Sequence, residues 1–252
     1  MCLINFQYKD HPRYKLVIAA NRDEFYERPT APAQFWEDEP GILAGRDLMQ
    51  MGTWLGVARN GRIAALTNFR DPSMPEADKI SRGAIVRDFL STALAPEQFL
   101  KSLNPEDYTG FNIIAGDADH LFYYNNIENH LAEVEPGLHG LSNHLLDTPW
   151  PKVIKGKNYL ERYLSERDEV DPDDLFRFLA DNEQAPDSTL PKTGVGLEFE
   201  RMLSSMFIKS PEYGTRSATV VLIDRDNHVT FAERVYEKGE FKEQNVFEFD
   251  IE

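Results

Sequence analysis

Short, largely apolar segments occur in pairs along this chain, and a polar turn joins the members of each pair. Such pairs predict β-hairpins. There are four of them: Leu3–Tyr8 with Tyr14–Ala20, Thr53–Ala58 with Ile63–Asn68, Phe111–Ala115 with Leu121–Tyr124, and Ala218–Ile223 with Val229–Val235. The second pair encloses Asn60-Gly61, and Asn-Gly between two apolar runs is the strongest short-range hairpin signal.

Other segments have the apolar spacing or the starting residues of helices. These are Ile80–Leu90 after a capping Asp78, Pro96–Leu100, Pro151–Leu164, Pro172–Leu179 after Asp171, and Leu197–Phe207. Antiparallel hairpins with helices inserted between them predict an α+β fold rather than a parallel βαβ array. Because no repeat and no Gly/Ser linker divides the sequence, we expect residues 1–252 to form a single domain.

Composition narrows the possible functions. The chain has 252 residues and a formal net charge of -16, which argues against partners such as nucleic acid and anionic membrane surfaces. It contains no apolar run of the roughly 20 residues that span a bilayer, and its first residues do not resemble a signal peptide. We therefore expect a cytoplasmic protein without a membrane span.

Metal and nucleotide cofactors are not expected. The chain has one cysteine and six histidines, with no HExxH-type spacing, so we predict no metal site. Neither a GxGxxG segment after a strand nor a GxxxxGK[ST] loop is present. The expected partner is a small-molecule substrate or ligand, and the sequence does not define the oligomeric state.

Cys2 is the sharpest chemical feature. If Tyr8 pairs with Tyr14, Cys2 lies opposite Ala20, within two residues, and so beside the polar run 21–24. Removal of Met1 would give Cys2 a free α-amine, which can accept the proton of the residue's own thiol. Position alone favours the alternative that Cys2 is a small buried residue opening a strand.

The polar run that follows the second strand offers groups that could tune such a nucleophile. Arg22 could lower the pKa of the thiol, and Asp23 or Glu24 could hold the amine in place. Taken alone, the run Asn21-Arg22-Asp23-Glu24 favours a solvated exit from a strand, because charge clusters usually face water.

Further candidates lie far along the chain. Asn68 and Asn143 each follow a strand-like stretch, and an asparagine amide can donate to a developing oxyanion. Arg216 enters an apolar strand, and Trp54 is large enough to line an apolar pocket. Taken singly, an asparagine at a strand end is more often a turn residue, Arg216 is more typical of a surface ion pair, and core packing is the commoner explanation for Trp54.

Together these segments resemble one family strongly. The matching segments are Met1-Cys2, Asn21–Phe25 with Arg28-Pro29, Gly52–Gly56, Leu66–Asn68 with Arg70–Pro72, Gly140–Asn143 with Leu146–Lys152, and Tyr213–Ser217. They are similar to the NRDE family, also called the transport and Golgi organisation protein 2 family. The resemblance spans nearly the whole chain.

That family resembles, more distantly, the N-terminal-nucleophile cysteine hydrolases of the bile-salt hydrolase, penicillin V acylase and acid ceramidase group. The resemblance implies a four-layer αββα sandwich of two antiparallel sheets. It also implies Cys2 as nucleophile, with Asn68, Asn143 and Arg216 in matching order and context.

The second strand departs from the hydrolase pattern Arg-Asn-x-Asp. If the asparagines align, Asp23 takes the acidic position and Ala20 replaces the arginine; otherwise Glu24 is the acid and Asn21 replaces the arginine. The leading hypothesis is an amidohydrolase acting on linear C–N amide bonds. A ligand carrier or trafficking factor for haem- or lipid-type ligands is the alternative, and a scaffold protein is a third.

Overall fold

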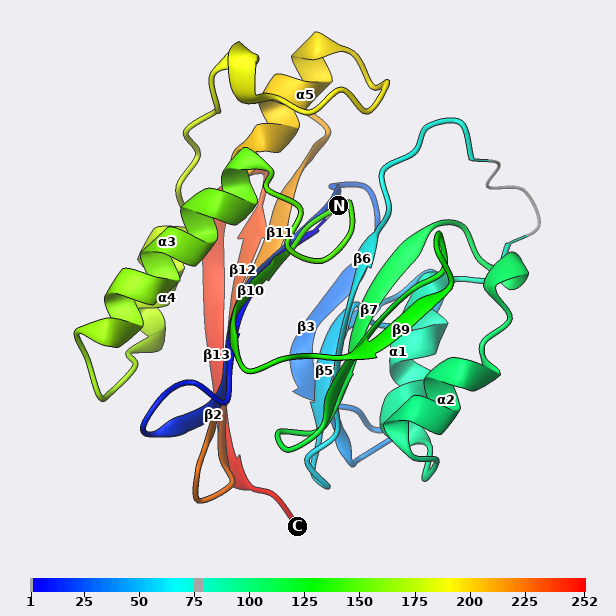
Figure 1. The fold of residues 1–252 in the computed structure, drawn as a ribbon, viewed down its shortest axis with the longest axis vertical. Helices are drawn as coiled ribbons and strands as arrows, with labels where there is room; N and C mark the ends of the chain where they lie inside the picture. The colour runs from blue at the N-terminus through cyan, green and yellow to red at the C-terminus, as the bar shows by residue number, and fades with distance from the viewer. Residues whose placement is uncertain (1, 75–78) are drawn as a thin grey trace.

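A computed structural model describes residues 2–74 and 79–252, whose strands form one six-stranded and one seven-stranded antiparallel sheet (Figure 1). The six-stranded sheet has the order β10-β1-β2-β11-β12-β13, with β1 (Cys2–Tyr8), β2 (Tyr14–Phe25), β10 (Gly137–Leu141), β11 (Tyr213–Asp224), β12 (His228–Glu237) and β13 (Glu240–Asp250). The seven-stranded sheet runs from β3 to β9 in sequence order, with β3 (Thr30–Phe35), β4 (Ile42–Asp47), β5 (Leu55–Ala58), β6 (Ile63–Asn68), β7 (Phe111–Gly116), β8 (Leu121–Asn125) and β9 (His130–Glu133).

Helices cover the outer faces of both sheets. They are α1 (Arg82–Ser91), α2 (Pro96–Ser102), α3 (Pro151–Ser165), α4 (Pro172–Leu179) and α5 (Leu197–Ser204). In Figure 1, α3 and α4 lie outside the six-stranded sheet, and α1 and α2 lie outside the seven-stranded one. The α+β prediction and the four-layer αββα sandwich are therefore confirmed.

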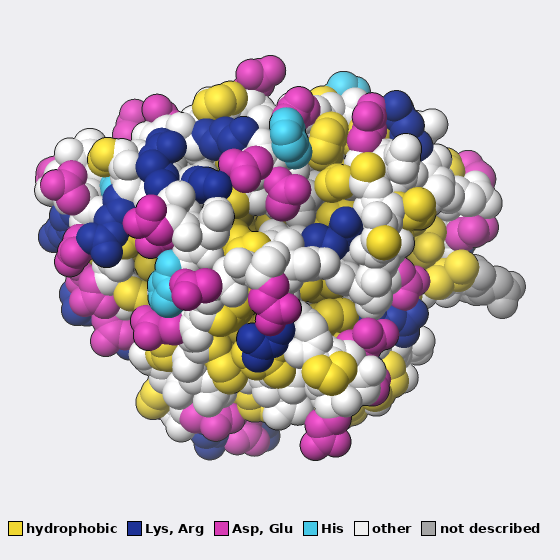
Figure 2. Space-filling model, turned by 90° about the horizontal axis from the view of Figure 1, so that it is seen from below, with side chains coloured by type: hydrophobic (Ala, Val, Ile, Leu, Met, Phe, Trp, Pro, Cys, Tyr) yellow, Lys and Arg dark blue, Asp and Glu magenta, His cyan; other side chains and the backbone are white. Residues whose placement is uncertain are grey.

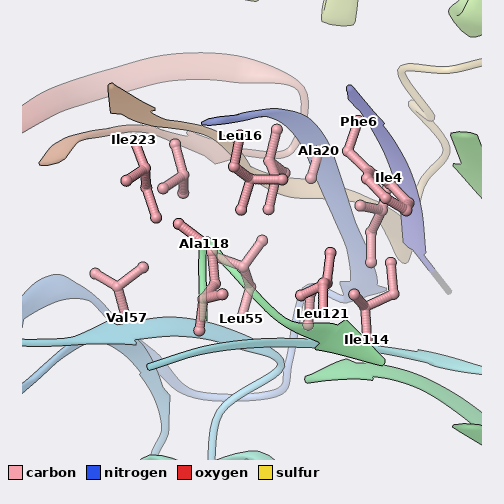
Figure 3. Close-up of a cluster of buried hydrophobic side chains, with 14 of the residues drawn as sticks. Ile4, Phe6, Leu16, Ala20, Leu55, Val57, Ile114, Ala118, Leu121 and Ile223 are labelled. Carbon is pink, nitrogen blue, oxygen red and sulfur yellow. The ribbon is translucent and has the colours of Figure 1, made fainter. Parts of the chain in front are cut away.

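The two sheets face each other across an apolar core (Figure 3). Because side chains alternate across a strand, Ile4 and Phe6 of β1 point into this core while Leu3 points toward the helices. Every residue of β1 is buried, since both faces of its sheet are covered. Val57 and Ile114 approach from the opposite sheet.

The predicted hairpins all form, and the first differs from the expected register by two residues. Tyr8 pairs with Leu16 and Cys2 pairs with Arg22, rather than with Ala20. The reason is that Tyr14 begins β2 but its N–H donates to His11 Nδ1 at 3.3 Å, and the turn closes where the Lys9 N–H donates to the Lys15 carbonyl at 2.7 Å. The shift keeps Cys2 on the same face of the sheet and brings it directly beside the polar run.

The helix boundaries differ from the expectation by up to three residues, and α2 and α3 extend to Ser102 and Ser165. Helix α1 begins at Arg82 instead of Ile80, and Asp78, its expected cap, lies outside the described residues. Helix α5 ends at Ser204 instead of Phe207, because Ser205 is extended and its hydroxyl donates to the Met202 carbonyl. Asp171 caps α4 as predicted by accepting from the Asp173 N–H.

The surface mixes charges of both signs. On the face in Figure 2, basic and acidic side chains are interspersed rather than gathered into separate fields. No helix of the described residues combines the length and apolarity that crossing a membrane requires.

A pair of leucines tests the role of the inter-sheet core. Leu43 of β4 is fully buried there, so Leu43→Ala should lower the free energy of unfolding by about 2–5 kcal/mol. Leu48, which is 48% exposed, provides the matched control, and Leu48→Ala should change the free energy of unfolding by less than ~0.5 kcal/mol. Urea titration followed by circular dichroism measures both, and equal losses would contradict this core assignment.

Candidate functional site

Where the apolar filling between the two sheets ends, polar side chains surround a cavity of about 700 Å³. Both sheets contribute to its wall. The expected site residues that line it are Cys2, Arg22, Asp23, Glu24, Trp54, Asn68 and Arg216. Residues separated by more than 200 positions thus meet at one place, although no single segment of the sequence contains the site.

Cys2 begins β1 and is held on both sides. It pairs with Arg22 of β2, and its carbonyl accepts a hydrogen bond from the Ser142 hydroxyl at 3.2 Å. The residue is 8% exposed. Cys2 is therefore a buried strand residue, as one interpretation of its position expected, and it also lines the cavity that contains the other candidate residues.

The surroundings of the thiol work in opposite directions. Burial is the main cause that raises the pKa of Cys2, and the Asp23 carboxylate adds to the rise. The Arg22 guanidinium and a hydrogen bond from the Asp23 backbone N–H lower this pKa. These two groups favour the thiolate, but burial outweighs them, and the pKa of Cys2 lies above its ordinary value.

Of the two acidic candidates, Asp23 is the one beside Cys2. Its side chain is 1% exposed and accepts a hydrogen bond from the Thr215 hydroxyl at 2.7 Å. Glu24 instead lies 3.9 Å from both Arg22 and Arg28, which are themselves part of the cavity wall. Burial is the main cause that raises the pKa of Asp23.

Asn21 faces away from the cavity. It pairs with Leu3 and Ala218, which pack under the helices. Its side chain Nδ2 donates to the carbonyls of Leu179 and Met206, both at 2.9 Å. Asn21 therefore fastens the site strand β2 to the helical layer.

The two asparagines expected near an oxyanion lie one behind the other. Asn68, at the end of β6, lines the cavity. Asn143 is fully buried, and its Nδ2 donates to the Asn68 carbonyl at 2.9 Å. Its Oδ1 accepts from Ser142, whose hydroxyl also contacts Cys2. Asn143 thus braces the end of β6 against the start of β1.

A buried polar chain fixes the loop that carries Asn143. The Tyr123 hydroxyl donates to Asn112 Oδ1 at 2.7 Å and accepts from the Leu146 N–H at 3.1 Å. Burial is the main cause that raises the pKa of Tyr123 to about 12, so this hydroxyl remains a donor. Nothing in the local sequence of Tyr123 or Asn112 indicated this function.

Arg216 is placed by a β-bulge. In the pairing of β11 with β2, Thr215 pairs with Asp23 and Ser217 with Arg22, so Arg216 is the extra residue. Its guanidinium donates to the carbonyls of the turn after β2 and to Thr30 Oγ1. Arg216 therefore secures this turn while lining the cavity, and its guanidinium is largely used in doing so.

Glu233 is a site residue that the sequence analysis missed. This carboxyl is 3% exposed, lines the cavity, and accepts from the Ala33 N–H across the two sheets at 2.6 Å. A register shift between β3 and β4 frees that N–H from the ladder. Burial is the main cause that raises the pKa of Glu233 to about 7. The sequence does contain one indication of this site residue. Glu233 follows Val229 and Phe231 at intervals of two, so it faces the same side of β12 as these core residues.

Lys152 and Arg70 were also missed. Lys152, the second residue of α3, is 2% exposed, and Arg70 is buried behind the end of β6. Arg70 Nη1 donates to Glu200 Oε2 at 2.9 Å, and its guanidinium lies over the Trp150 ring. Their positions within the segments that match the family were the indication that the sequence offered for them.

No set of three or more His, Cys, Asp or Glu side chains that could hold a metal occurs in residues 2–74 and 79–252.

Comparison with known proteins then places the chain in a family. A family model described as Transport and Golgi organisation 2 matches residues 1–238. The chain belongs to this family. It is 39% identical to the human Transport and Golgi organization protein 2 homolog over 257 residues, which cover 93% of this chain and 92% of that protein. The Drosophila melanogaster Transport and Golgi organization protein 2 is 29% identical over 265 residues, covering 92% and 91%.

Solved structures of similar fold come from hydrolases. The C2A mutant of a conjugated bile acid hydrolase from Clostridium perfringens aligns with a TM-score of 0.53 and 9% identity, covering 99% of this chain and 97% of that one. The Caenorhabditis elegans N-acylethanolamine-hydrolyzing acid amidase ortholog aligns at 0.50 and 12% identity, covering 88% and 92%. At such low identity these likenesses show the fold, and the resemblance to N-terminal-nucleophile hydrolases is confirmed at that level.

The Glu233 carboxyl predicts a specific dependence of stability on pH. Its pKa is raised from 4.5 to about 7 on folding, so its contribution to stability is fully present below about pH 4.5 and is lost as pH rises through about 7. Glu233→Gln keeps an acceptor for the Ala33 N–H but does not titrate. Relative to this variant, the wild type should lose about 3 kcal/mol of unfolding free energy across that interval.

Denaturant unfolding of both proteins at a series of pH values measures the difference. Subtracting the variant removes the contributions of all other titrating groups. A difference that stays constant with pH would contradict the assignment.

Proposed function

We propose that this protein is an amidohydrolase in which Cys2, freed of Met1, attacks the carbonyl carbon of a linear C–N amide bond in a small acyl-amide substrate. The observation that carries the proposal is the position of the Cys2 thiol. It lies on the wall of the inter-sheet cavity, accepts from the Asp23 N–H, and shares that wall with Asn68. Nucleophile, anion-stabilising donor and amide side chain thus border one space.

The names of the similar structures support the choice of reaction. One is a conjugated bile acid hydrolase whose structure was determined for a mutant of a cysteine at position 2, and the other hydrolyses N-acylethanolamines, which are acyl amides. Cys2 of this chain stands at the same position from the start. A cavity of about 700 Å³ is within the range of ~300–1,000 Å³ that small-molecule sites occupy.

The reaction would proceed in two steps. The Cys2 sulfur bonds to the carbonyl carbon while the thiol proton passes to the α-amine of the same residue. The C–N bond then breaks, and the leaving nitrogen departs as an amine with that proton. A water molecule next attacks the thioester, and the α-amine again takes and returns a proton. The C–S bond breaks, the acyl group leaves as a carboxylic acid, and Cys2 is restored as a free thiol.

The other residues would assist at defined points. The Asn68 amide donates to the oxyanion, and Asn143 holds Asn68 in place. Asp23 holds the protonated α-amine, and Arg22 favours the thiolate. Arg216 fixes the turn after β2, and Trp54 supplies an apolar wall for the acyl group.

The decisive test combines intact mass with trapping of the acyl-enzyme. Purified protein should lack the mass of one methionine residue, and a panel of N-acyl amides should contain a substrate that leaves its acyl group on Cys2. Cys2→Ala should lower turnover by at least ~10³-fold while keeping its thermal unfolding curve.

A chain with an uncleavable extension before Met1 is the matched control. It keeps the thiol but withholds the α-amine, so it should be as inactive as Cys2→Ala. Activity that survives both changes would exclude this mechanism.

A ligand carrier is the second candidate. Two observations favour it: burial raises the pKa of the Cys2 thiol, and the Arg216 guanidinium is engaged with backbone carbonyls rather than with Cys2. A carrier of haem- or lipid-type ligands would use the cavity for storage rather than for chemistry. Calorimetry showing stoichiometric binding without release of product, unchanged in Cys2→Ala, would support this candidate.

A further inference from the structure

Lys152 breaks two local rules of protein structure. Its side chain is 2% exposed, although lysine is almost never buried without a partner. It is also the second residue of the 15-residue helix α3, where the helix dipole disfavours a cation. A methionine would fill the same space with neither penalty. Residues that break local rules in this way concentrate at functional sites.

The ammonium of Lys152 has no compensating hydrogen bond within residues 2–74 and 79–252. An ammonium buried in this way is expensive, because it loses its hydration without a direct replacement. Desolvation is accordingly the main cause that lowers the pKa of Lys152 to about 8, and the nearby Arg70 lowers it further. The start of α3 packs against β1, because Trp150 and Val153 share a buried cluster with Leu3. Asp23 and Cys2 oppose the shift in the pKa of Lys152.

Two acidic and two basic side chains are buried behind Cys2: Asp23, Glu200, Arg70 and Lys152. Arg70 is joined to Glu200 by an ion pair of 2.9 Å, and the second oxygen of Glu200 accepts from the N–H and the hydroxyl of Thr193. Asp23 and Lys152 are complementary charges that interact with each other, and Arg22 is the cation that acts on the thiol from the paired position of β2. Among the charged groups that favour ionised Asp23, Lys152 acts most strongly.

We propose that Lys152 is a positioning residue of the Cys2 site, whose buried ammonium offsets the Asp23 carboxylate and thereby favours the thiolate of Cys2. The inference deepens the proposed amidohydrolase function and rests on it for its biological purpose. Without Lys152, the carboxylate of Asp23 would stand beside the sulfur and oppose its ionisation. With Lys152, Asp23 can remain ionised to hold an α-amine while its effect on the sulfur is reduced.

The groups that face this pair come from several elements. Cys2 belongs to β1, and Arg22 with Asp23 to β2; Arg70 follows β6, Tyr213 begins β11, and Glu200 lies on α5. Burial holds the pKa of Tyr213 well above its usual value, so it stays neutral in the range of the test. Lys152 loses a positive charge near pH 8, as does the N-terminal α-amine, which also acts on Cys2 and Asp23. The amine is common to the wild type and the variants, so comparing them at the same pH isolates the contribution of Lys152.

The rate at which iodoacetamide alkylates Cys2 tests the inference directly. The chain has one cysteine, so the reaction reports on this thiol alone, and it requires neither turnover nor removal of Met1. At about pH 7, Lys152→Met should react ~10-fold more slowly than the wild type, the effect of one pKa unit. By about pH 9.5 the two rates should converge, because wild-type Lys152 has then lost its proton.

Lys152→Arg is the matched control, because its charge does not titrate in this range. It should match the wild type at about pH 7 and react faster than the wild type at about pH 9.5. A ratio of rates that is the same at both pH values, for either variant, would overturn the inference. If Lys152→Met does not fold, the arginine variant alone decides. Either outcome is independent of whether an amide substrate is found, so the two proposals fail separately.

Discussion

The structure depends on the face-to-face packing of two antiparallel sheets. Each inner face is made of the alternate side chains of its strands, and these fill the space between the sheets along most of its length. At one end the alternation continues, but polar residues take the inward positions. Cys2 follows this rule in the phase of Ile4 and Phe6, and Glu233 follows it in the phase of Val229 and Phe231. The cavity is thus the polar continuation of the core.

Much of this fold was readable from the sequence, because hairpins are local. The four predicted hairpins are joined by short turns, and their strands are nearest neighbours in the sheets. Other strands gave no such signal. β13 is mostly exposed and has few apolar residues until Val246, while β3 contains Pro32 and is irregularly paired. Strands of this kind exist because a neighbour offers them a free edge, and that information is absent from their own residues.

The site was predictable in part for a related reason. Cys2 and the run 21–24 meet through one hairpin, so register arithmetic brought them together within two residues. Asn68 and Arg216 were candidates because of their positions at strand ends, and the resemblance to the family to which the chain belongs strengthened them. Lys152 lies within a matching segment and Glu233 in the inward phase of β12, but neither signal shows that the side chain is buried at the site. Each approaches the site from a different layer, and the sequence does not reveal which lysine or glutamate will be buried.

Several charged side chains are buried at the end of the molecule that contains the cavity. Asp23, Lys152, Arg70 and Glu200 are all removed from water, and such groups contribute little to stability compared with apolar residues of similar size. The core between the sheets supplies the stability that this arrangement lacks. The apolar core therefore stabilises the fold, and the charged end of the molecule contains the candidate site.

The β1–β2 hairpin has a further consequence for how this family can diverge. Side chains alternate faces with a period of two, so shifting β1 by one position against its neighbours would turn the Cys2 sulfur toward α3 and bring Leu3 to the cavity. The length of the turn 9–13 can therefore change by an even number of residues without moving the sulfur to the other face of the sheet. Gains or losses of two residues preserve which side of the sheet the sulfur faces, whereas single insertions that displace β1 erase the site while leaving a sheet that still pairs.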